Sequence, residues 1–157
     1  MTDESLGRAE LLEARVRTYF KACNEGDHEK MASVFAPSVV HYFPPGMFGP
    51  RTGSRAIADL WRDFIRRVGS RWTIDRLVAS DQEVVIEFTH FQPGTGSLVR
   101  GAEWYEFDAG GLITVIKAYY ASPRDRSLPA NELDGYPYLE LGYPVAPPDE
   151  APTLDGD

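Results

Sequence analysis

The chain has little of what several classes of site require. Its single cysteine, Cys23, cannot form an internal disulfide. Its three histidines show none of the spacings typical of metal sites, such as HxH or HExxH, so no metal or other cofactor is expected. No apolar run approaches the roughly 18 residues of a membrane span, and the acidic start MTDESLGRAE carries no targeting signal. We therefore expect a cytoplasmic protein with no membrane partner.

Positive charge is absent from the C-terminal part of the chain. After Arg126 there is no Lys or Arg, but there are seven acids: Glu132, Asp134, Glu140, Asp149, Glu150, Asp155 and Asp157. Because these seven belong to the 24 acids of the chain, the preceding body has 17 acids against 16 bases. Neither part has the basic stripe that a phosphate backbone requires, so nucleic acid is not an expected partner.

What is present indicates one folded domain with a tail. With 157 residues, 43% of them hydrophobic, the chain can form a single core. We expect this domain over residues 1–122 and a Pro-rich, acidic tail over 123–157. The middle of the tail, residues 133–144, contains several Tyr and Leu, so it should fold back over the body or over a partner subunit. Residues past about 148 are expected to be disordered.

Helical periodicity dominates the first half of the sequence. The first amphipathic stripe should end at Gly26, which can adopt the left-handed conformation, and Asp27 should cap a short second helix. Ser54 is expected to cap a third helix that ends at Gly69. The two stripes are Leu12, Val16, Tyr19, Phe20 and Cys23, and Ile57, Leu60, Trp61, Phe64 and Val68.

The sequence predicts five strands. The first, SVVHYF, follows Pro37 and precedes the third helix. From residue 71 onward, four more segments alternate with a period of two: RWTIDRLVAS, EVVIEFTHF, SLVRGAEWYEF and LITVIKAYYA. Short loops containing Gly separate the four and predict an antiparallel meander. Three helices followed by a mostly antiparallel sheet, with the helices on one face, is an α+β fold.

Glu103 is the sharpest candidate for chemistry. Alternation places it on one strand face with Val99, Tyr105 and Phe107, whereas Glu106 shares the other face with Arg100. Burial disfavours the charged form of a carboxyl group. Glu103 is therefore a candidate general acid, or a neutral donor to a developing oxyanion. The alternative is that it only satisfies a neighbouring hydroxyl or amide in the protein interior.

Two segments resemble the cone-shaped superfamily of nuclear transport factor 2. They are VRTYFKACNEGDHEKMASVFAPSVVHYFPP and RGAEWYEFDAGGLITVIKAYY. The latter is similar to the closing hairpin of the SnoaL-like branch, which includes polyketide cyclases and is related to ketosteroid isomerases. The resemblance covers roughly residues 12–121. It implies a cone of three N-terminal helices packed on a curved sheet, and commonly a homodimer. It says less about activity, because this fold hosts many unrelated functions.

The resemblance also implies roles for particular residues. In ketosteroid isomerases, a Tyr on the first helix and an acid on this strand form the oxyanion hole, and the motifs place them at Tyr19 and Glu103. The general-base position falls on Phe43, which cannot take a proton, and the position of the acid of the related epoxide hydrolases falls on Ala118. The mechanism of neither enzyme is therefore expected.

His41 and His90 remain as proton carriers near neutral pH, although each could also be a satisfied core histidine. The predicted function is a cofactor-independent isomerase, cyclase or dehydratase acting on a hydrophobic carbonyl or polyketide-like molecule, with Tyr19, His41, His90 and Glu103 as catalytic residues. The alternative is a non-catalytic module for ligand binding or dimerisation. The residues expected to line the substrate pocket are Phe43, Trp61, Phe64, Phe88, Tyr105, Ile116 and Tyr120.

A homodimer is also expected from the residues themselves. Leu98, Ala102 and Trp104 alternate outward along one strand. An exposed apolar strip on a twisted sheet usually has a partner.

Overall fold

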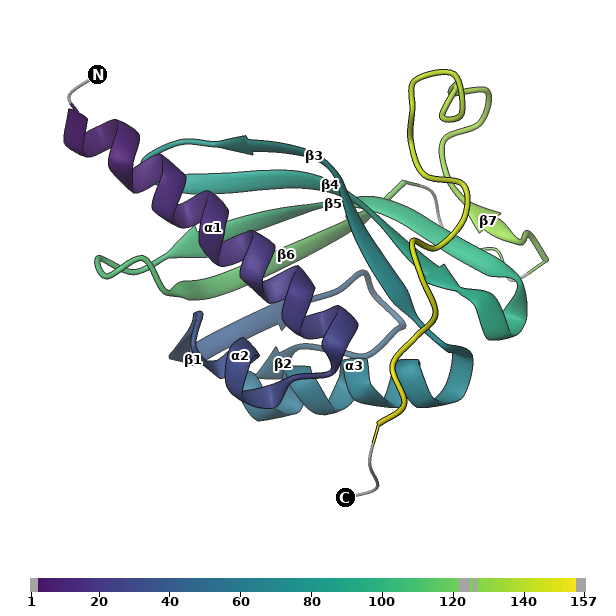
Figure 1. The fold of residues 1–157 in the computed structure, drawn as a ribbon, viewed down its shortest axis with the longest axis horizontal. Coiled ribbons are helices and arrows are strands. Elements are labelled where there is room, and N and C mark those ends of the chain that lie inside the picture. The colour runs from purple at the N-terminus through teal and green to yellow at the C-terminus, as the bar shows by residue number, and fades with distance from the viewer. Residues whose placement is uncertain (1–2, 122–124, 126, 155–157) are drawn as a thin grey trace.

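The computed structural model describes residues 3–121, 125 and 127–154, with the side chains of α1 described from Gly7 onward. Three helices and most of the sheet follow the predicted order (Figure 1). The elements are α1 (Asp3–Glu25), α2 (His28–Ala32), β1 (Phe35–Tyr42), β2 (Arg51–Thr52), α3 (Ser54–Val68), β3 (Arg71–Ala79), β4 (Glu83–Gln92), β5 (Ser97–Phe107), β6 (Ile113–Tyr120) and β7 (Ala130–Asn131). None of the described helices is long and apolar enough to cross a membrane.

Helix α1 forms for the predicted reason. All five residues of its apolar stripe are buried in the core. Gly26 has a φ of 66°, and the side chain of Asp27 accepts a hydrogen bond from the backbone N–H of Lys30 at 2.9 Å, so the break and the cap are confirmed. Asn24 adds a link that the pattern did not predict: its side chain donates to Trp72 O and accepts from Trp72 N, both at 2.8 Å. It therefore ties the end of α1 to β3.

Helix α3 ends as predicted but begins differently. Gly69 caps its C-terminus in the left-handed conformation, with a φ of 68°. At its start, Gly53 is the N-cap and Ser54 is already the first helical residue, without a side-chain capping bond. The φ of 88° at Gly53 is open to glycine and lets the chain turn from β2 directly into the helix.

The sheet has the strand order β2-β1-β6-β5-β4-β3, and its last four strands form the predicted antiparallel meander. β1 pairs with β6 in parallel, and β7 pairs with the start of β5 in parallel. The helices pack on one face of this curved sheet and leave the other face outside the cone (Figure 1). The α+β prediction and the cone-shaped arrangement of three helices are confirmed.

Pro37 does not stop the chain ahead of β1, as the sequence suggested, but lies within the strand. The register between β1 and β6 shifts between Phe35 and Val40, and both Pro37 and Ser38 are exposed there. At such an irregularity a residue need not donate to the ladder, which is why a proline is tolerated.

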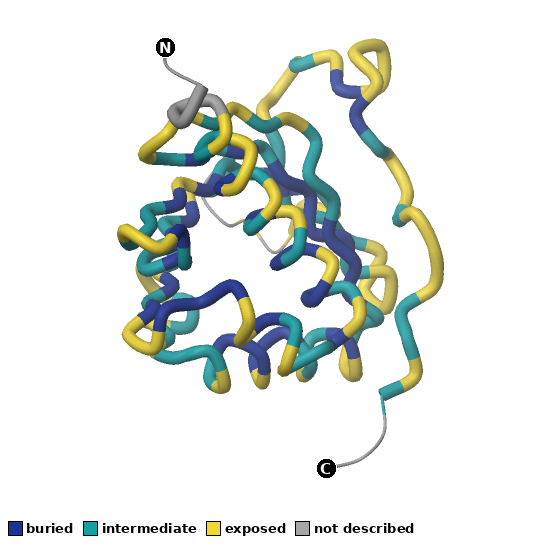
Figure 2. The backbone as a smooth tube through the Cα atoms, turned by 60° about the vertical axis from the view of Figure 1, so that its left-hand side comes forward, coloured by how far each residue is buried: buried dark blue, intermediate teal, exposed yellow. Residues whose placement is uncertain are grey.

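The C-terminal segment runs along one side of the domain (Figure 2) and contacts it at particular residues. Leu98 N donates to Pro129 O at 2.8 Å beside β7, and Tyr138 and Tyr143 are buried against the outer face of the sheet. The expected disorder past residue 148 is wrong for residues 149–154. Asp149 pairs with Arg71, and two apolar side chains pack on the core, those of Ala151 and Leu154.

Candidate functional site

The described residues form several hollows, two of which share Trp61, His90 and Tyr120 in their lining. We call the larger, of about 410 Å³, the mouth cavity, and the smaller, of about 20 Å³, the deep cavity. Trp61, His90 and Tyr120 line both, so they stand between the two. The deep cavity has room for about one water molecule or a group of that size.

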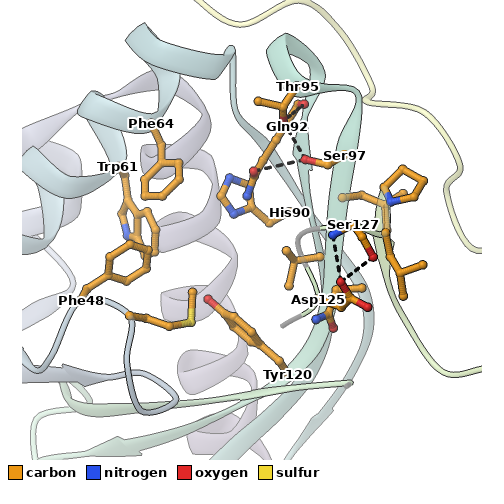
Figure 3. A pocket seen from close by; sticks show the side chains of 16 residues that line it. Phe48, Trp61, Phe64, His90, Gln92, Thr95, Ser97, Tyr120, Asp125 and Ser127 are labelled. Atoms are coloured by element: carbon orange, nitrogen blue, oxygen red, sulfur yellow. Dashed lines mark hydrogen bonds between the residues drawn. The ribbon is translucent and has the colours of Figure 1, made fainter. Parts of the chain in front are cut away.

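The mouth cavity has one aromatic wall and one polar wall (Figure 3). Gln92, Ser97 and Ser127 are on the polar side, and the Ser97 hydroxyl is 2.7 Å from that of Thr95. Asp125 is the one charged residue in the described lining, and the hydrogen bonds from Ser127 lower the pKa of its carboxyl group. The wall therefore suits an amphipathic ligand better than an anionic one. The aromatic side is formed by Phe48, Trp61, Phe64, His90 and Tyr120.

Glu103 lies in the deep cavity, as the strand alternation predicted. β5 places it beside Ile86 of β4 and the small Ala118 of β6, and only 6% of it is exposed. The hydroxyl of Tyr105, two residues further along the same face, donates a hydrogen bond to Oε2 of Glu103. Burial and the neighbouring Glu103 raise the pKa of this tyrosine well above its usual value, so it stays a donor.

His41 meets Glu103 from β1 but does not line either cavity. Its Nε2 is 3.6 Å from Glu103 Oε1, and its ring is stacked on Phe43 at 4.0 Å between centroids. Its Nδ1 is 3.2 Å from the carbonyl oxygen of Tyr42. Because a carbonyl can only accept, Nδ1 carries a hydrogen. Nε2 is buried and has no hydrogen-bond partner among the residues that the structure describes.

Tyr19 also lines the deep cavity, but its hydrogen-bond partner is not Glu103. The indole N–H of Trp61 donates to its hydroxyl at 2.8 Å. Burial raises the pKa of Tyr19 well above its usual value, so the phenol is neutral. The tyrosine bonded to Glu103 is Tyr105, which sequence reasoning placed among the pocket-lining residues. The sequence did contain a signal for this contact, because Tyr105 lies two residues after Glu103 and therefore on the same face of the strand.

His90 is held on several sides between the two cavities. It stacks on Trp72 at 4.6 Å between centroids, and Trp61 and Phe64 approach it edge-on. The hydroxyl oxygen of Ser70 is 2.7 Å from its Nε2. Burial lowers the pKa of His90 to about 3, so the ring is neutral at physiological pH.

The predicted lining residues divide into three groups. Trp61, Phe64 and Tyr120 line the mouth cavity, and Phe43 and Phe88 line the deep cavity. Tyr105 and Ile116 are fully buried and line neither. Sequence reasoning missed the lining residues contributed by loops, by the adjoining ends of β4 and β5 and by the C-terminal segment: Met47, Phe48, Gln92, Thr95, Ser97, Leu98, Val99, Asp125, Ser127, Leu128, Pro129 and Asn131.

Comparisons with known proteins identify the family. A family model described as SnoaL-like domain matches residues 16–116. A solved protein of unknown function with a cystatin-like fold, from Methylobium petroleophilum PM1, is 43% identical with a TM-score of 0.72, covering 90% of this chain and 95% of that one. A search of curated proteins finds no match.

Two further solved structures share the fold at lower identity. A candidate ketosteroid isomerase from Kribbella flavida DSM 17836 is 18% identical with a TM-score of 0.63, covering 74% of this chain and 82% of its own. A candidate polyketide cyclase from Sinorhizobium meliloti is 17% identical with a TM-score of 0.58, covering 68% and 94%. The chain belongs to the SnoaL-like domain family.

Proposed function

We propose that the cone binds an uncharged, hydrophobic carbonyl compound and moves one of its protons at Glu103, in a cofactor-independent isomerase, cyclase or dehydratase reaction. One observation carries this proposal. The carboxyl group of Glu103 lies in an aromatic cavity opposite an enclosed nitrogen of His41 that has no hydrogen-bond partner.

The contacts of His41 and Glu103 favour an arrangement with a proton between them. Since Nδ1 of His41 bonds to Tyr42 O, a neutral ring would turn the bare lone pair of Nε2 toward Glu103 Oε1 at 3.6 Å. If Glu103 were ionised, its carboxylate oxygen would face the lone pair of Nε2, and two hydrogen-bond acceptors would meet in a buried site without a hydrogen between them. Such an arrangement is unfavourable. The pair therefore holds one proton, either as imidazolium and carboxylate or as imidazole and carboxylic acid. Such coupled groups can give and take a proton as a unit.

Glu103 is the member of the pair that can touch a ligand, because it lines the deep cavity and His41 does not. With the pair as imidazolium and carboxylate, Glu103 takes the proton from a carbon next to a ligand carbonyl. The C–H electron pair becomes a C=C bond, and the carbonyl π electrons move to oxygen. Glu103 then returns the proton to another carbon, which is an isomerisation. Alternatively, the enolate carbon attacks a second carbonyl carbon and the alkoxide that forms takes the proton from Glu103, which is a cyclisation. Where a hydroxyl group lies β to the carbonyl, the enolate expels it with that proton as water, which is a dehydration.

The two cavities would bind different parts of the ligand. The mouth cavity, of about 410 Å³, can take a flat ring system against its aromatic wall, while the deep cavity admits only a small reacting end. The fold that the chain shares with a candidate ketosteroid isomerase and a candidate polyketide cyclase supports the same reaction classes.

Deuterium exchange tests the proposal without the natural substrate. The protein is incubated in D₂O with 2-tetralone and other flat cyclic ketones, and exchange next to the carbonyl is followed by NMR. Glu103→Gln keeps the shape but cannot accept the proton, so exchange should fall by about 10²-fold or more. The matched control is Glu106→Gln, on the opposite face of β5, where Glu106 lies 3.6 Å from Lys117. Its rate should stay unchanged. Absence of protein-dependent exchange with every ketone, or equal rates in wild type and Glu103→Gln, contradicts the proposal.

A non-catalytic ligand-binding module is the second candidate. The small volume of the deep cavity favours it, as do the hydrogen bond from Tyr105 to Glu103 Oε2 and the position of His41 Nε2 at 3.6 Å from Oε1. In that case these groups only satisfy one another and a ligand stays in the mouth cavity. Bound small molecules would be detected by native mass spectrometry after incubation with a metabolite extract, and none of the ketones would exchange.

A further inference from the structure

Ser70 is a buried hydroxyl that the proposed reaction does not use. It follows Gly69 at the C-terminal end of α3, where Gly69 N bonds to Ile65 O at 2.9 Å and fixes the exit of the chain. No part of Ser70 is exposed, and its Oγ lies 2.7 Å from Nε2 of His90. Either atom could in principle donate, because a neutral imidazole has one N–H and one bare nitrogen.

The hydrogen-bond count of Ser70 decides between the two arrangements. Within the described residues, the Ser70 hydroxyl has no other side-chain or backbone partner than His90. If His90 donated, the hydroxyl hydrogen of Ser70 would be buried without an acceptor, which is costly. If Ser70 donates, only hydroxyl lone pairs stay unfilled, which is tolerated far more often. The latter arrangement leaves Nε2 bare and puts the ring hydrogen on Nδ1.

The rest of the ring fits this assignment. Trp72 stacks on one face at 4.6 Å, and Phe64 packs edge-on at 5.3 Å between centroids, so the imidazole cannot turn over freely. Its Nδ1 has no partner among the described residues and is not fully enclosed. His90 lines both the mouth and the deep cavity, and Figure 3 shows it beside the aromatic wall of the mouth cavity.

We infer that Ser70 is a positioning residue that fixes His90 as the Nδ1–H tautomer, so that His90 donates a hydrogen bond to an acceptor oxygen of the ligand at the passage between the two cavities. Burial keeps the ring neutral by lowering its pKa to about 3. A neutral imidazole N–H can polarise a carbonyl group without giving up its proton.

This role adds a second residue to the proposed function. The ligand that His90 would bind is the one proposed above, so this part of the inference rests on the proposed function. Glu103 and His90 line the same deep cavity, so one would take a proton from carbon while the other stabilises the charge that develops on oxygen. His90 is then not the base, which leaves the proton transfer to Glu103 and its partner His41.

The tautomer is measured directly by two-bond ¹H–¹⁵N NMR correlations on protein labelled with ¹⁵N-histidine, near pH 7. His90→Phe assigns the signals by their loss. The expected wild-type result is a protonated Nδ1 and a bare Nε2. A protonated Nε2 would overturn the inference. Ser70→Ala should shift the Nε2 resonance because it removes the hydrogen bond, whereas Ser80→Ala, in the turn after β3, should leave it unchanged. An unchanged Nε2 resonance in folded Ser70→Ala would also overturn it.

A matched pair of probes tests the donor role. 2-Acetylnaphthalene carries an acceptor oxygen, and 2-isopropylnaphthalene has nearly the same shape without one. His90→Phe should weaken binding of the ketone by about 5-fold, as the loss of one hydrogen bond does, and leave the hydrocarbon almost unaffected. Equal effects on the two probes would contradict the donor role. If neither probe binds the wild type, the proposed ligand cavity fails, while the NMR result still decides the tautomer.

Discussion

Strand β5 buries one charged side chain on each of its faces, and the two are treated differently. Arg100, on the outer face, donates one hydrogen bond from each of its three guanidinium nitrogens: to Glu132 Oε2 at 2.8 Å, Thr89 Oγ1 at 2.9 Å and Pro144 O at 3.1 Å. It also stacks on the ring of Tyr138. Glu103, on the inner face, accepts one hydrogen bond and faces a histidine nitrogen without a hydrogen-bond partner.

The difference indicates a structural role for Arg100 and a chemical role for Glu103. A buried charge whose nitrogens each have a hydrogen-bond partner holds elements together, and here it holds the C-terminal segment on the sheet. A buried pair that is left short of partners costs stability, so it persists where it serves another purpose. Changes on the outer face should therefore reduce stability, and changes on the inner face should reduce activity.

Arg100→Met should give the largest loss of stability. It leaves Glu132 without its partner and removes the hydrogen bond to Thr89 and the contact with Tyr138. The free energy of unfolding should therefore fall by about 3 kcal/mol, a typical result of breaking a buried pair. Urea denaturation measures this. Arg55→Met is the control, because Arg55 is exposed and pairs with Asp59 only at 3.7 Å. A similar midpoint for both variants would show that the outer pairing is not structural.

His90, on the inner face of the sheet, should make the free energy of unfolding depend on pH. Its folded pKa of about 3 lies below the value of about 6.5 in unfolded chains, so the unfolded state binds more protons between these values. Stability should then fall as the pH falls, by about 2 kcal/mol between pH 6.5 and 4.5 from this residue alone. Denaturation at both pH values, in wild type and His90→Phe, isolates the contribution. The same pH slope in both proteins would contradict it.

Local sequence patterns could predict most of the helices and the meander. The stripe from Leu12 to Cys23 and the stops at Gly26 and Gly69 each depend on neighbours in the chain, so periodicity and backbone conformation suffice. The parallel pairing of β1 with β6 joins residues 75 to 78 positions apart in the chain, and no local signal specifies it. Pro37 was misplaced because the strand irregularity that tolerates it depends on that same pairing.

In the candidate site, only those positions were predictable for which strand alternation determines the face of the sheet on which a side chain lies. Glu103 and Arg100 fall on opposite faces because the strand period is two. The partners were not predictable: Tyr19 was expected beside Glu103, but its hydroxyl bonds to Trp61 and Tyr105 takes that place. Ser70 carried no signal, because its role comes from packing between a helix end and a strand.

We propose that the uncovered part of the outer face pairs with a second copy of the chain. The C-terminal segment covers Arg100, but Trp104, Tyr119 and Val78 remain 39%, 57% and 73% exposed. Trp104→Glu should then weaken self-association, by about tenfold or more, since a charge would replace an apolar contact. Light scattering at tens of micromolar measures the mass. A monomeric wild type, unchanged by the substitution, would exclude this interface.

Asp149→Asn should have the smallest effect. Asp149 pairs with the buried Arg71, but its own side chain is 65% exposed, so solvent screens the interaction. A loss of less than about 1 kcal/mol in the free energy of unfolding is expected. A loss as large as that of Arg100→Met would place the main anchor of the C-terminal segment at residue 149 instead of at Arg100.

The most direct test measures stability and ketone exchange together in Glu103→Gln and Arg100→Met. The account predicts that Glu103→Gln loses exchange by about 10²-fold or more while its free energy of unfolding stays within about 1 kcal/mol of wild type. Arg100→Met should show the reverse, with reduced stability and an unchanged exchange rate per folded molecule. A Glu103→Gln protein that loses stability like Arg100→Met and exchanges like wild type would contradict the assignment of chemistry to the inner face.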